Sequence, residues 1–222
     1  MGATGKKVGV VLSGCGFLDG AEIHEATLTL LALDRAGAEA RVISPDLEQR
    51  HVVDHLVGEP AEGQRRNVRV ESARIARGAV ADLANVRAEE LDALVLPGGF
   101  GAAKNLCSFA VEGTEMTVLA DLERLVREMH RAGKPMGFIC IAPVIAAKVL
   151  GGHAPRLTIG TDRKTAAALV AFGATHVECS CEEAVLDEEN KLVSTPAYML
   201  GPTIAPVAAG IARLVQKVLE LA

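Results

Sequence analysis

The stretch Lys134-Pro-Met-Gly-Phe-Ile-Cys-Ile-Ala-Pro-Val-Ile-Ala-Ala-Lys-Val-Leu150 decides the fold of this chain. Its first half is a short apolar run that ends at Cys140, which is typical of a buried strand. Its second half is rich in Ala, Val and Ile and is typical of a helix packed on a sheet. A strand that turns at once into a helix is the repeating unit of an α/β fold. The stretch therefore predicts a sheet of parallel strands covered by helices.

Cys140 is the candidate nucleophile. A thiol at the start of a helix lies beside unpaired amides and the positive end of the helix dipole, which favours the thiolate. The strand-to-helix turn would also lift the side chain off the sheet edge, as in a hydrolase nucleophile elbow, and leave the N–H of Ile141 free to bind an oxyanion. Gly137 and Ala142 stand near the places of the usual elbow glycines. The alternative is a buried cysteine that serves as a small apolar residue.

The composition favours a core of aliphatic side chains. Half of the 222 residues are hydrophobic, but only five Phe and one Tyr are aromatic, with no Trp. Val, Leu, Ile and Ala must therefore fill the interior, which suits a sheet buried on both faces by helices. The length is sufficient for one good core, so we expect a single domain over residues 1–222.

Charge and hydropathy exclude several partners. The net charge of −5 is mild, and no basic run is interleaved with aromatic residues, so we expect no nucleic-acid partner. No apolar stretch reaches membrane-spanning length without a charge or a turn signal, and the N-terminus lacks the apolar region of a signal peptide. The sequence therefore predicts a cytoplasmic protein without a membrane partner.

Metal and nucleotide cofactors are not expected either. An odd number of cysteines without a C-x-x-C pair suggests neither a disulfide framework nor a zinc site. His51 and His55 share an i, i+4 spacing, but no third ligand stands nearby, so we expect a solvated loop. The glycines of the stretch 13–20 miss the spacing of a dinucleotide fingerprint.

The pattern along the chain predicts alternating strands and helices. The expected strands cover residues 7–12, 39–44, 74–79, 91–96, 134–140, 157–161 and 176–181, with a hairpin formed by 184–186 and 191–195. The expected helices cover residues 21–36, 114–131, 141–150, 165–172 and 204–221. The strand at 91–96 ends in Pro97-Gly98-Gly99, a turn that can bring backbone amides close to a ligand.

Five motifs taken together resemble the DJ-1/PfpI superfamily, whose fold is like that of the glutamine amidotransferases. They are V-G-V-V-L-S-G at 8–14, the helix-opening Glu25, L-V-L-P-G-G-F-G-A-A-K-N-L at 94–106, G-F-I-C-I-A-P at 137–143 and S-T-P-A-Y at 194–198. The branch most similar to the chain is that of the enhancing lycopene biosynthesis proteins, or isoprenoid-biosynthesis glyoxalases. The resemblance covers nearly the whole chain. It implies a flavodoxin-like, doubly wound, mostly parallel sheet with helices on both faces and a nucleophile elbow.

The resemblance also implies a site and an activity. Cys140 would be the elbow cysteine, Glu25 the acid that reaches it, and Gly98 and Gly99 a turn whose amides lie near the thiol. The implied activity is that of a cofactor-independent glyoxalase, which converts small 2-oxoaldehydes such as glyoxal and methylglyoxal to 2-hydroxy acids. Members of the superfamily usually pair, so we expect a homodimer.

The chain also departs from the family pattern. Many relatives carry a histidine on the strand after the elbow helix, but residues 156–161 contain none. His176, with Glu178 on the same strand face, is one substitute, and Glu22 is an alternative acid to Glu25. His24 would point away from Glu25 into solvent. A redox-sensing or stress-protective role for Cys140 and a cysteine-dependent amidase or peptidase remain as alternatives.

The first prediction is that Cys140 reacts faster than the other four cysteines at neutral pH, because it alone lies at a strand-to-helix turn. Limited alkylation followed by peptide mapping measures this. Cys15 is the main rival because it lies in a glycine-rich loop, and its preferential labelling would contradict the prediction.

Overall fold

A central sheet of seven strands organises the computed structural model, which describes residues 5–222. The strands are β1 Lys7–Val11, β2 Glu39–Ser44, β5 Ala81–Asp82, β6 Ala93–Leu96, β7 Met136–Ile139, β10 Val185–Asp187 and β11 Leu192–Thr195. Their order is β10-β11-β7-β6-β1-β2-β5, and every neighbouring pair is parallel except the hairpin of β10 and β11. The expected mostly parallel, flavodoxin-like sheet is confirmed.

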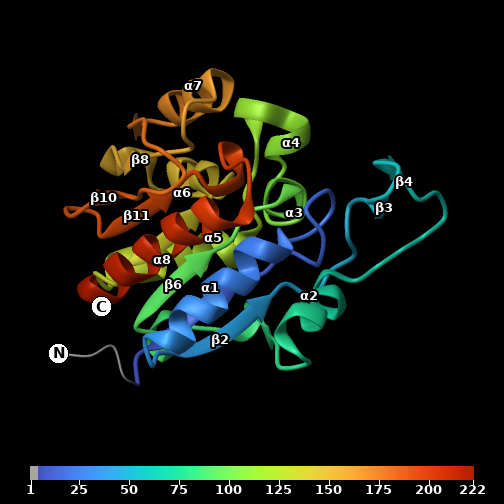
Figure 1. Cartoon of the computed structure of the whole chain (residues 1–222), viewed down its shortest axis with the longest axis horizontal. Coiled ribbons are helices and arrows are strands. Elements are labelled where there is room, and N and C mark those ends of the chain that lie inside the picture. Colours follow the sequence, from blue (N-terminus) through green and yellow to red (C-terminus); the bar gives the residue numbers. More distant parts are fainter. Residues whose placement is uncertain (1–4) are drawn as a thin grey trace.

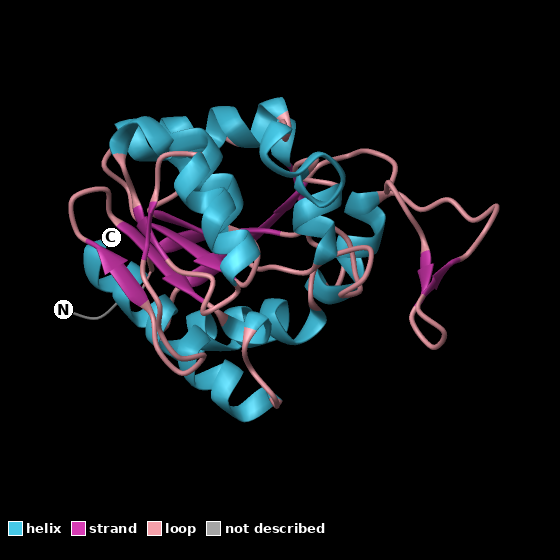
Figure 2. Ribbon diagram, turned by 90° about the horizontal axis from the view of Figure 1, so that it is seen from above, coloured by secondary structure: helices cyan, strands magenta, loops and turns pink. Residues whose placement is uncertain are grey.

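Helices cover both faces of this sheet (Figures 1 and 2). They are α1 Ile23–Arg35, α2 Val68–Ala76, α3 Phe100–Lys104, α4 Phe109–Glu112, α5 Ala120–Arg131, α6 Pro143–Leu150, α7 Arg163–Ala171 and α8 Ile204–Leu221. Helices α1 and α8 pack against each other on one face, whereas α5 and α6 pack together on the other. Each face therefore has its own apolar core.

Alternation along the strands divides the apolar residues between the two cores. Val8 and Val10 of β1 lie in the core of α1 and α8, whereas Leu94 and Leu96 of β6 lie in the core of α5 and α6. Successive side chains of a strand point to opposite faces, so a strand covered on both sides must be apolar throughout. This explains the unbroken apolar runs of the sequence.

Short elements complete the chain. The hairpin of β3 Val53–Asp54 and β4 Glu59–Pro60 projects away from the sheet (Figures 1 and 2). Strands β8 Arg156–Leu157 and β9 Thr175–His176 form a second small sheet beside β10 and β11. The 3-10 turns are η1 Leu83–Asn85, η2 Ala88–Glu90, η3 Gly113–Glu115, η4 Gly151–His153 and η5 Ala197–Met199.

Several sequence expectations need correction. Residues 74–79 were expected to form a strand, but helix α2 runs to Ala76, because Asn67 caps its start and Arg77 ends it in a left-handed conformation. The helix expected at 114–131 begins only at Ala120, since Val118 forms a β-bridge to Cys107 instead. The strand expected at 176–181 also ends after His176.

Two glycine-containing loops pack against each other at the carboxyl ends of β1 and β6. Gly101 N–H donates a hydrogen bond to the carbonyl of Gly20, in the loop after β1, at 2.8 Å. Glu22 N–H in turn donates to the carbonyl of Gly98 at 3.0 Å. A Cβ atom on Gly101 would lie 2.5 Å from the backbone of Gly20, which no real side chain tolerates. These contacts fix the start of α1 relative to the turn after β6.

The second prediction follows from this contact. Gly101→Ala should lower the melting temperature by about 5 °C, because the new methyl group forces the two loops apart at a cost of about 1–3 kcal/mol. Gly152→Ala is the matched control, since no atom lies within 4 Å of a Cβ at that position. Thermal unfolding followed by circular dichroism measures both. Equal melting temperatures for the two variants would contradict the prediction.

Candidate active site

Cys140 occupies a strained turn between β7 and α6. Its φ angle is +60°, a conformation that few residues with a side chain adopt, and its N–H donates to the carbonyl of Thr195 at 2.9 Å. The side chain is 8% exposed. A Cβ on Gly98 would lie 2.5 Å from the Cβ of Cys140, so only glycine fits beside the thiol. The expected elbow is present, but it is enclosed by its neighbours.

Glu25 lies against this thiol from the first turn of α1. Its side chain is fully buried, and its Oε2 and the Cβ of Cys140 lie 2.9 and 2.5 Å from the position that a Cβ on Gly98 would take. One carboxyl oxygen, Oε2, accepts the N–H of Gly98 at 2.8 Å, and the other, Oε1, accepts the N–H of Tyr198 at 3.3 Å. Glu22 caps the helix, because its carboxylate accepts the N–H of Glu25 at 2.6 Å. The structure therefore brings Glu25 to the thiol and gives Glu22 a capping role.

Both acidic groups of the site resist ionisation. Burial, with the nearby Glu22 charge, raises the pKa of Glu25 to about 8. Burial and the Glu25 carboxylate also raise the pKa of the Cys140 thiol well above its ordinary value. This direction is the reverse of the one expected from the sequence, because desolvation and a neighbouring carboxylate outweigh a helix start. At neutral pH the pair therefore holds at least one proton.

Backbone donors around the sulfur favour its anionic form. The N–H groups of Gly99 and Ile141 face the Cys140 thiol closely enough to act against the upward shift of its pKa. The N–H of Gly98, unlike those of Gly99 and Ile141, binds the Glu25 carboxyl group. When the shared proton lies on Glu25, the thiolate thus has two backbone donors and one carboxyl donor.

His176 lies in the small second sheet. It lies in β9, half-buried, and its Nε2 accepts the N–H of Ile159 at 3.5 Å. Strand β9 pairs with β8, which contacts β11, the neighbour of the elbow strand. Glu178, its expected partner, is exposed. The structure therefore brings Glu25, Gly99 and Ile141 to Cys140 and leaves His176 in the small second sheet.

Sequence reasoning missed the contribution of Tyr198. Its backbone N–H binds Glu25, and its hydroxyl group lies 2.7 Å from His24 Nδ1. His24 is exposed, as expected, but it has this specific partner. The S-T-P-A-Y motif was the only signal for Tyr198, and a motif shows neither which backbone group binds an acid nor where a ring points.

Two further findings concern residues 5–222. In this part of the chain no three His, Cys, Asp or Glu side chains gather in a way that could hold a metal ion. No helix there is long and apolar enough to cross a membrane.

The third prediction concerns the proton on Glu25. Because the pKa of Glu25 is about 8 in the folded protein and 4.5 ordinarily, the folded state binds the extra proton between these values. The free energy of unfolding should therefore fall as the pH rises through this interval. Glu25→Gln has no carboxyl group at this position, so its free energy of unfolding should not show this fall. Relative to the natural protein, the free energy of unfolding of the variant should therefore increase by on the order of 3–5 kcal/mol between about pH 5 and pH 8.

Denaturant unfolding at several pH values measures this difference. Glu62→Gln, at an exposed acid, is the control and should follow the natural protein. Parallel curves for Glu25→Gln and the natural protein would show that Glu25 ionises in the ordinary range.

Known proteins resemble this chain over nearly its whole length. A human protein, glutamine amidotransferase-like class 1 domain-containing protein 3, mitochondrial, is 50% identical over 97% of this chain and 83% of its own length. The mitochondrial ES1 protein homolog of the rat is 48% identical over 97% of this chain and 84% of its own. These relatives correct the expected cytoplasmic location, because both are mitochondrial proteins by name. Targeting segments that are removed after import leave no trace in the composition of a folded domain.

Solved structures agree. An isoprenoid biosynthesis protein with an amidotransferase-like domain from Ehrlichia chaffeensis superposes with a TM-score of 0.90 at 38% identity, over 97% of this chain and 99% of its own. DJ-1beta of Drosophila melanogaster, at 22% identity and a TM-score of 0.57 over 99% of this chain and 96% of its own, shares the fold. The model of the DJ-1/PfpI family matches residues 15–197, which include Glu25, Gly99 and Cys140. With the elbow and its acid in place, the chain belongs to the DJ-1/PfpI family.

Proposed function

We propose that the protein is a cofactor-independent glyoxalase that converts small 2-oxoaldehydes, such as glyoxal and methylglyoxal, to 2-hydroxy acids. The observation that carries this proposal is the fully buried Glu25 carboxyl group that lies beside the Cys140 thiol. A nucleophile and a proton carrier in contact, beside two N–H donors, are the groups that this reaction needs.

The first step joins the thiol to the aldehyde. In the one-proton state with the proton on Glu25, the Cys140 thiolate attacks the aldehyde carbon and a C–S bond forms. The electron pair of the C=O bond moves to the oxygen, which the N–H groups of Gly99 and Ile141 stabilise. Glu25 then gives its proton to this oxygen. The product is a hemithioacetal, and Glu25 is left as a carboxylate.

The second step moves a hydrogen between the substrate carbons. The Glu25 carboxylate takes the proton from the carbon bound to sulfur, and an enediol forms. Glu25 then returns the proton to the neighbouring carbon. The first carbon is thereby oxidised to a thioester while the second is reduced to an alcohol, so no external oxidant or reductant is required. Water then hydrolyses the thioester, releasing the 2-hydroxy acid and the thiol.

The geometry favours a small substrate. Cys140 is 8% exposed, and the neighbouring Gly98 has no room even for a methyl group. A bulky peptide would require these loops to separate, which makes an amidase or peptidase a poorer fit. One chain already carries both Cys140 and Glu25. The homodimer stays a prediction from the resemblance.

The fourth prediction tests Glu25 as the proton carrier. Glu25→Gln should lower the turnover of glyoxal by at least ~100-fold, since the amide keeps the shape of the side chain but carries no proton between carbons. Cys140→Ser should abolish turnover. Product assays for glycolate, with far-ultraviolet circular dichroism to check folding, measure both variants.

Glu22→Gln and His176→Ala serve as controls for the assignment. Loss of activity in either, with near-normal activity in Glu25→Gln, would show that Glu25 is the wrong group. If the natural protein forms no hydroxy acid but gains oxygen mass at Cys140 in dilute peroxide, the redox-sensing alternative replaces the enzyme. Cleavage of a peptide amide would favour a hydrolase.

A further inference from the structure

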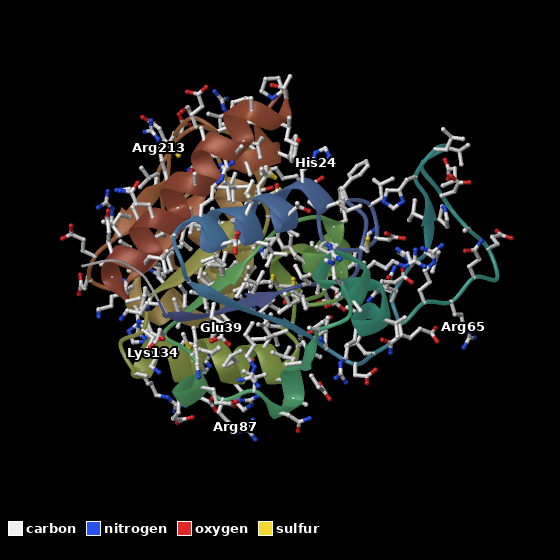
Figure 3. The ribbon with its side chains drawn as sticks, turned by 60° about the horizontal axis from the view of Figure 1, so that its bottom comes forward. His24, Glu39, Arg65, Arg87, Lys134 and Arg213 are labelled. Atoms are coloured by element: carbon white, nitrogen blue, oxygen red, sulfur yellow. The ribbon has the colours of Figure 1, made fainter. Side chains whose placement is uncertain are left out.

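The loop of residues 13–20, which joins β1 to α1, is held by a row of hydrogen bonds from residues 100–105. The accepting carbonyl groups are those of Ser13, Phe17, Leu18, Asp19 and Gly20, and the donors are the N–H groups of Phe100 and Gly101, the Nζ of Lys104 and the Nδ2 of Asn105. The loop leads into α1, and His24, labelled in Figure 3, marks this end of the helix. The segment of α3 therefore fixes the loop from which α1 starts.

Asn105 has the central place in this row. Its side chain is 7% exposed, and its Nδ2 group donates to the carbonyls of Ser13 and Asp19, both at 2.9 Å. Its Oδ1 accepts the N–H of Arg50, in the loop after β2, at 3.0 Å. Ser13 and Asp19 lie at the two ends of the loop, so a single amide group closes it. Only an NH2 group supplies two donors and leaves an acceptor on the same planar side chain.

The closed loop determines how α1 begins. Three residues after Asp19, the N–H of Glu22 donates to the carbonyl of Gly98, and the Glu22 carboxylate caps the helix by accepting the N–H of Glu25. Glu25 Oε2 then accepts the N–H of Gly98. A displacement of the loop at Asp19 would thus reach Glu25 within six residues of chain.

We propose that Asn105 is a positioning residue for the proton carrier Glu25. By closing the loop of residues 13–20, it sets the start of α1 and keeps the Glu25 carboxyl group beside the Cys140 thiol. The hydrogen bonds of its own side chain end at Ser13, Asp19 and Arg50, so Asn105 acts through the loop and not on the reacting atoms. Its effect on turnover rests on the proposed function, whereas its effect on the thiol does not.

The decisive variant is Asn105→Asp. The new side chain has the same shape and keeps an acceptor for the N–H of Arg50, but it places an oxygen where the NH2 group faced two buried carbonyls. Loss of both donors leaves these carbonyls unpaired, which favours an open loop. Asn105→Ala removes the same two bonds without adding a charge and takes its place if Asn105→Asp does not fold.

Asn190 supplies a matched control. It is also buried, and its Nδ2 donates to Asp187 Oδ2 at 2.8 Å and to the carbonyl of His153 at 3.3 Å. It lies in the turn before β11, at the amino end of that strand, whereas Cys140 lies beside the carboxyl end. Asn190→Asp and Asn190→Ala therefore disturb a comparable amide far from the loop of residues 13–20.

Thiol alkylation tests the positioning without any substrate. Burial and the Glu25 carboxylate raise the pKa of Cys140, so a carboxylate that moves away should let Cys140 react at lower pH. In Asn105→Asp the midpoint of the pH profile for alkylation by iodoacetamide should fall by about one pH unit. Cys15, inside the opened loop, should be labelled at least ~5-fold faster. Peptide mapping measures both cysteines, and neither value should change in Asn190→Asp.

Turnover supplies a second test. Asn105→Asp should lower kcat for glyoxal by ~10-fold and leave KM within about threefold, because a misplaced proton carrier slows the chemical step. The same change made in Glu25→Gln should lower kcat by less than about twofold, since a residue that acts through the Glu25 carboxyl group has little further effect once that group is gone.

The outcomes separate this role from the proposed function. Faster labelling of Cys15 with an unchanged Cys140 midpoint would show that the loop opens without moving Glu25, and the role of Asn105 would fall. An equal change in Asn190→Asp, or an equal loss of kcat with and without the Glu25 carboxyl group, would also overturn it. If the natural protein forms no glycolate but the Cys140 midpoint falls as expected, the proposed function fails and the positioning of Glu25 by Asn105 stands.

Discussion

The Glu25 carboxyl group joins the three segments that make up the site. One oxygen binds the amide of Gly98 after β6, the other binds the amide of Tyr198 in η5, and the group as a whole contacts Cys140 after β7. An uncompensated buried carboxyl group is costly, and these donors reduce that cost. The same bonds fix the positions of the loops, so the elbow, the glycine turn and the tyrosine cannot move independently of Glu25.

The topology of the sheet makes this meeting of segments possible. Strand β1 pairs with β2 on one side and β6 on the other, and the carboxyl ends of β1, β6 and β7 therefore lie next to one another. Ligands of open α/β sheets bind at such a switch point. Glycines at 20, 98 and 101 let the loops approach to distances that any side chain would prevent. Backbone atoms therefore lie close around Cys140 and Glu25.

Electrostatics then gives this narrow site its chemistry. Two groups that both lose a proton on ionisation lie in a place with little water, so burial raises the pKa of each, and the Glu25 carboxylate raises that of Cys140 further. A Cys-His pair instead stabilises a thiolate with a positive charge. Here the corresponding state is a thiolate beside a neutral carboxyl group, with the amides of Gly99 and Ile141 as further donors. A carboxyl group that holds a proton near neutral pH can both donate and accept it, which suits an isomerisation.

The sequence by itself determined the strands, the elbow and the family. Apolar runs such as Ala93–Leu96 and Met136–Ile139 correspond to strands because burial on two faces demands them, and the hairpin of β10 and β11 was visible from its polar turn. The helix α2 was missed, because residues 74–79 taken alone resemble a short strand and the cap at Asn67 lies outside that stretch. The expected cytoplasmic location was also wrong, since the composition of a folded domain does not report its compartment.

Only the tertiary structure decided how the site works. His24 and Tyr198 are 174 positions apart, and no local pattern could show that they form a hydrogen bond. The direction of the pKa shift at Cys140 was likewise hidden, because a strand-to-helix turn predicts a lowered value, whereas burial and Glu25 raise it. Periodicity and turn chemistry are local properties that a sequence states directly. Desolvation and contacts between distant segments depend on how the whole chain packs, and so they appear only in the folded molecule.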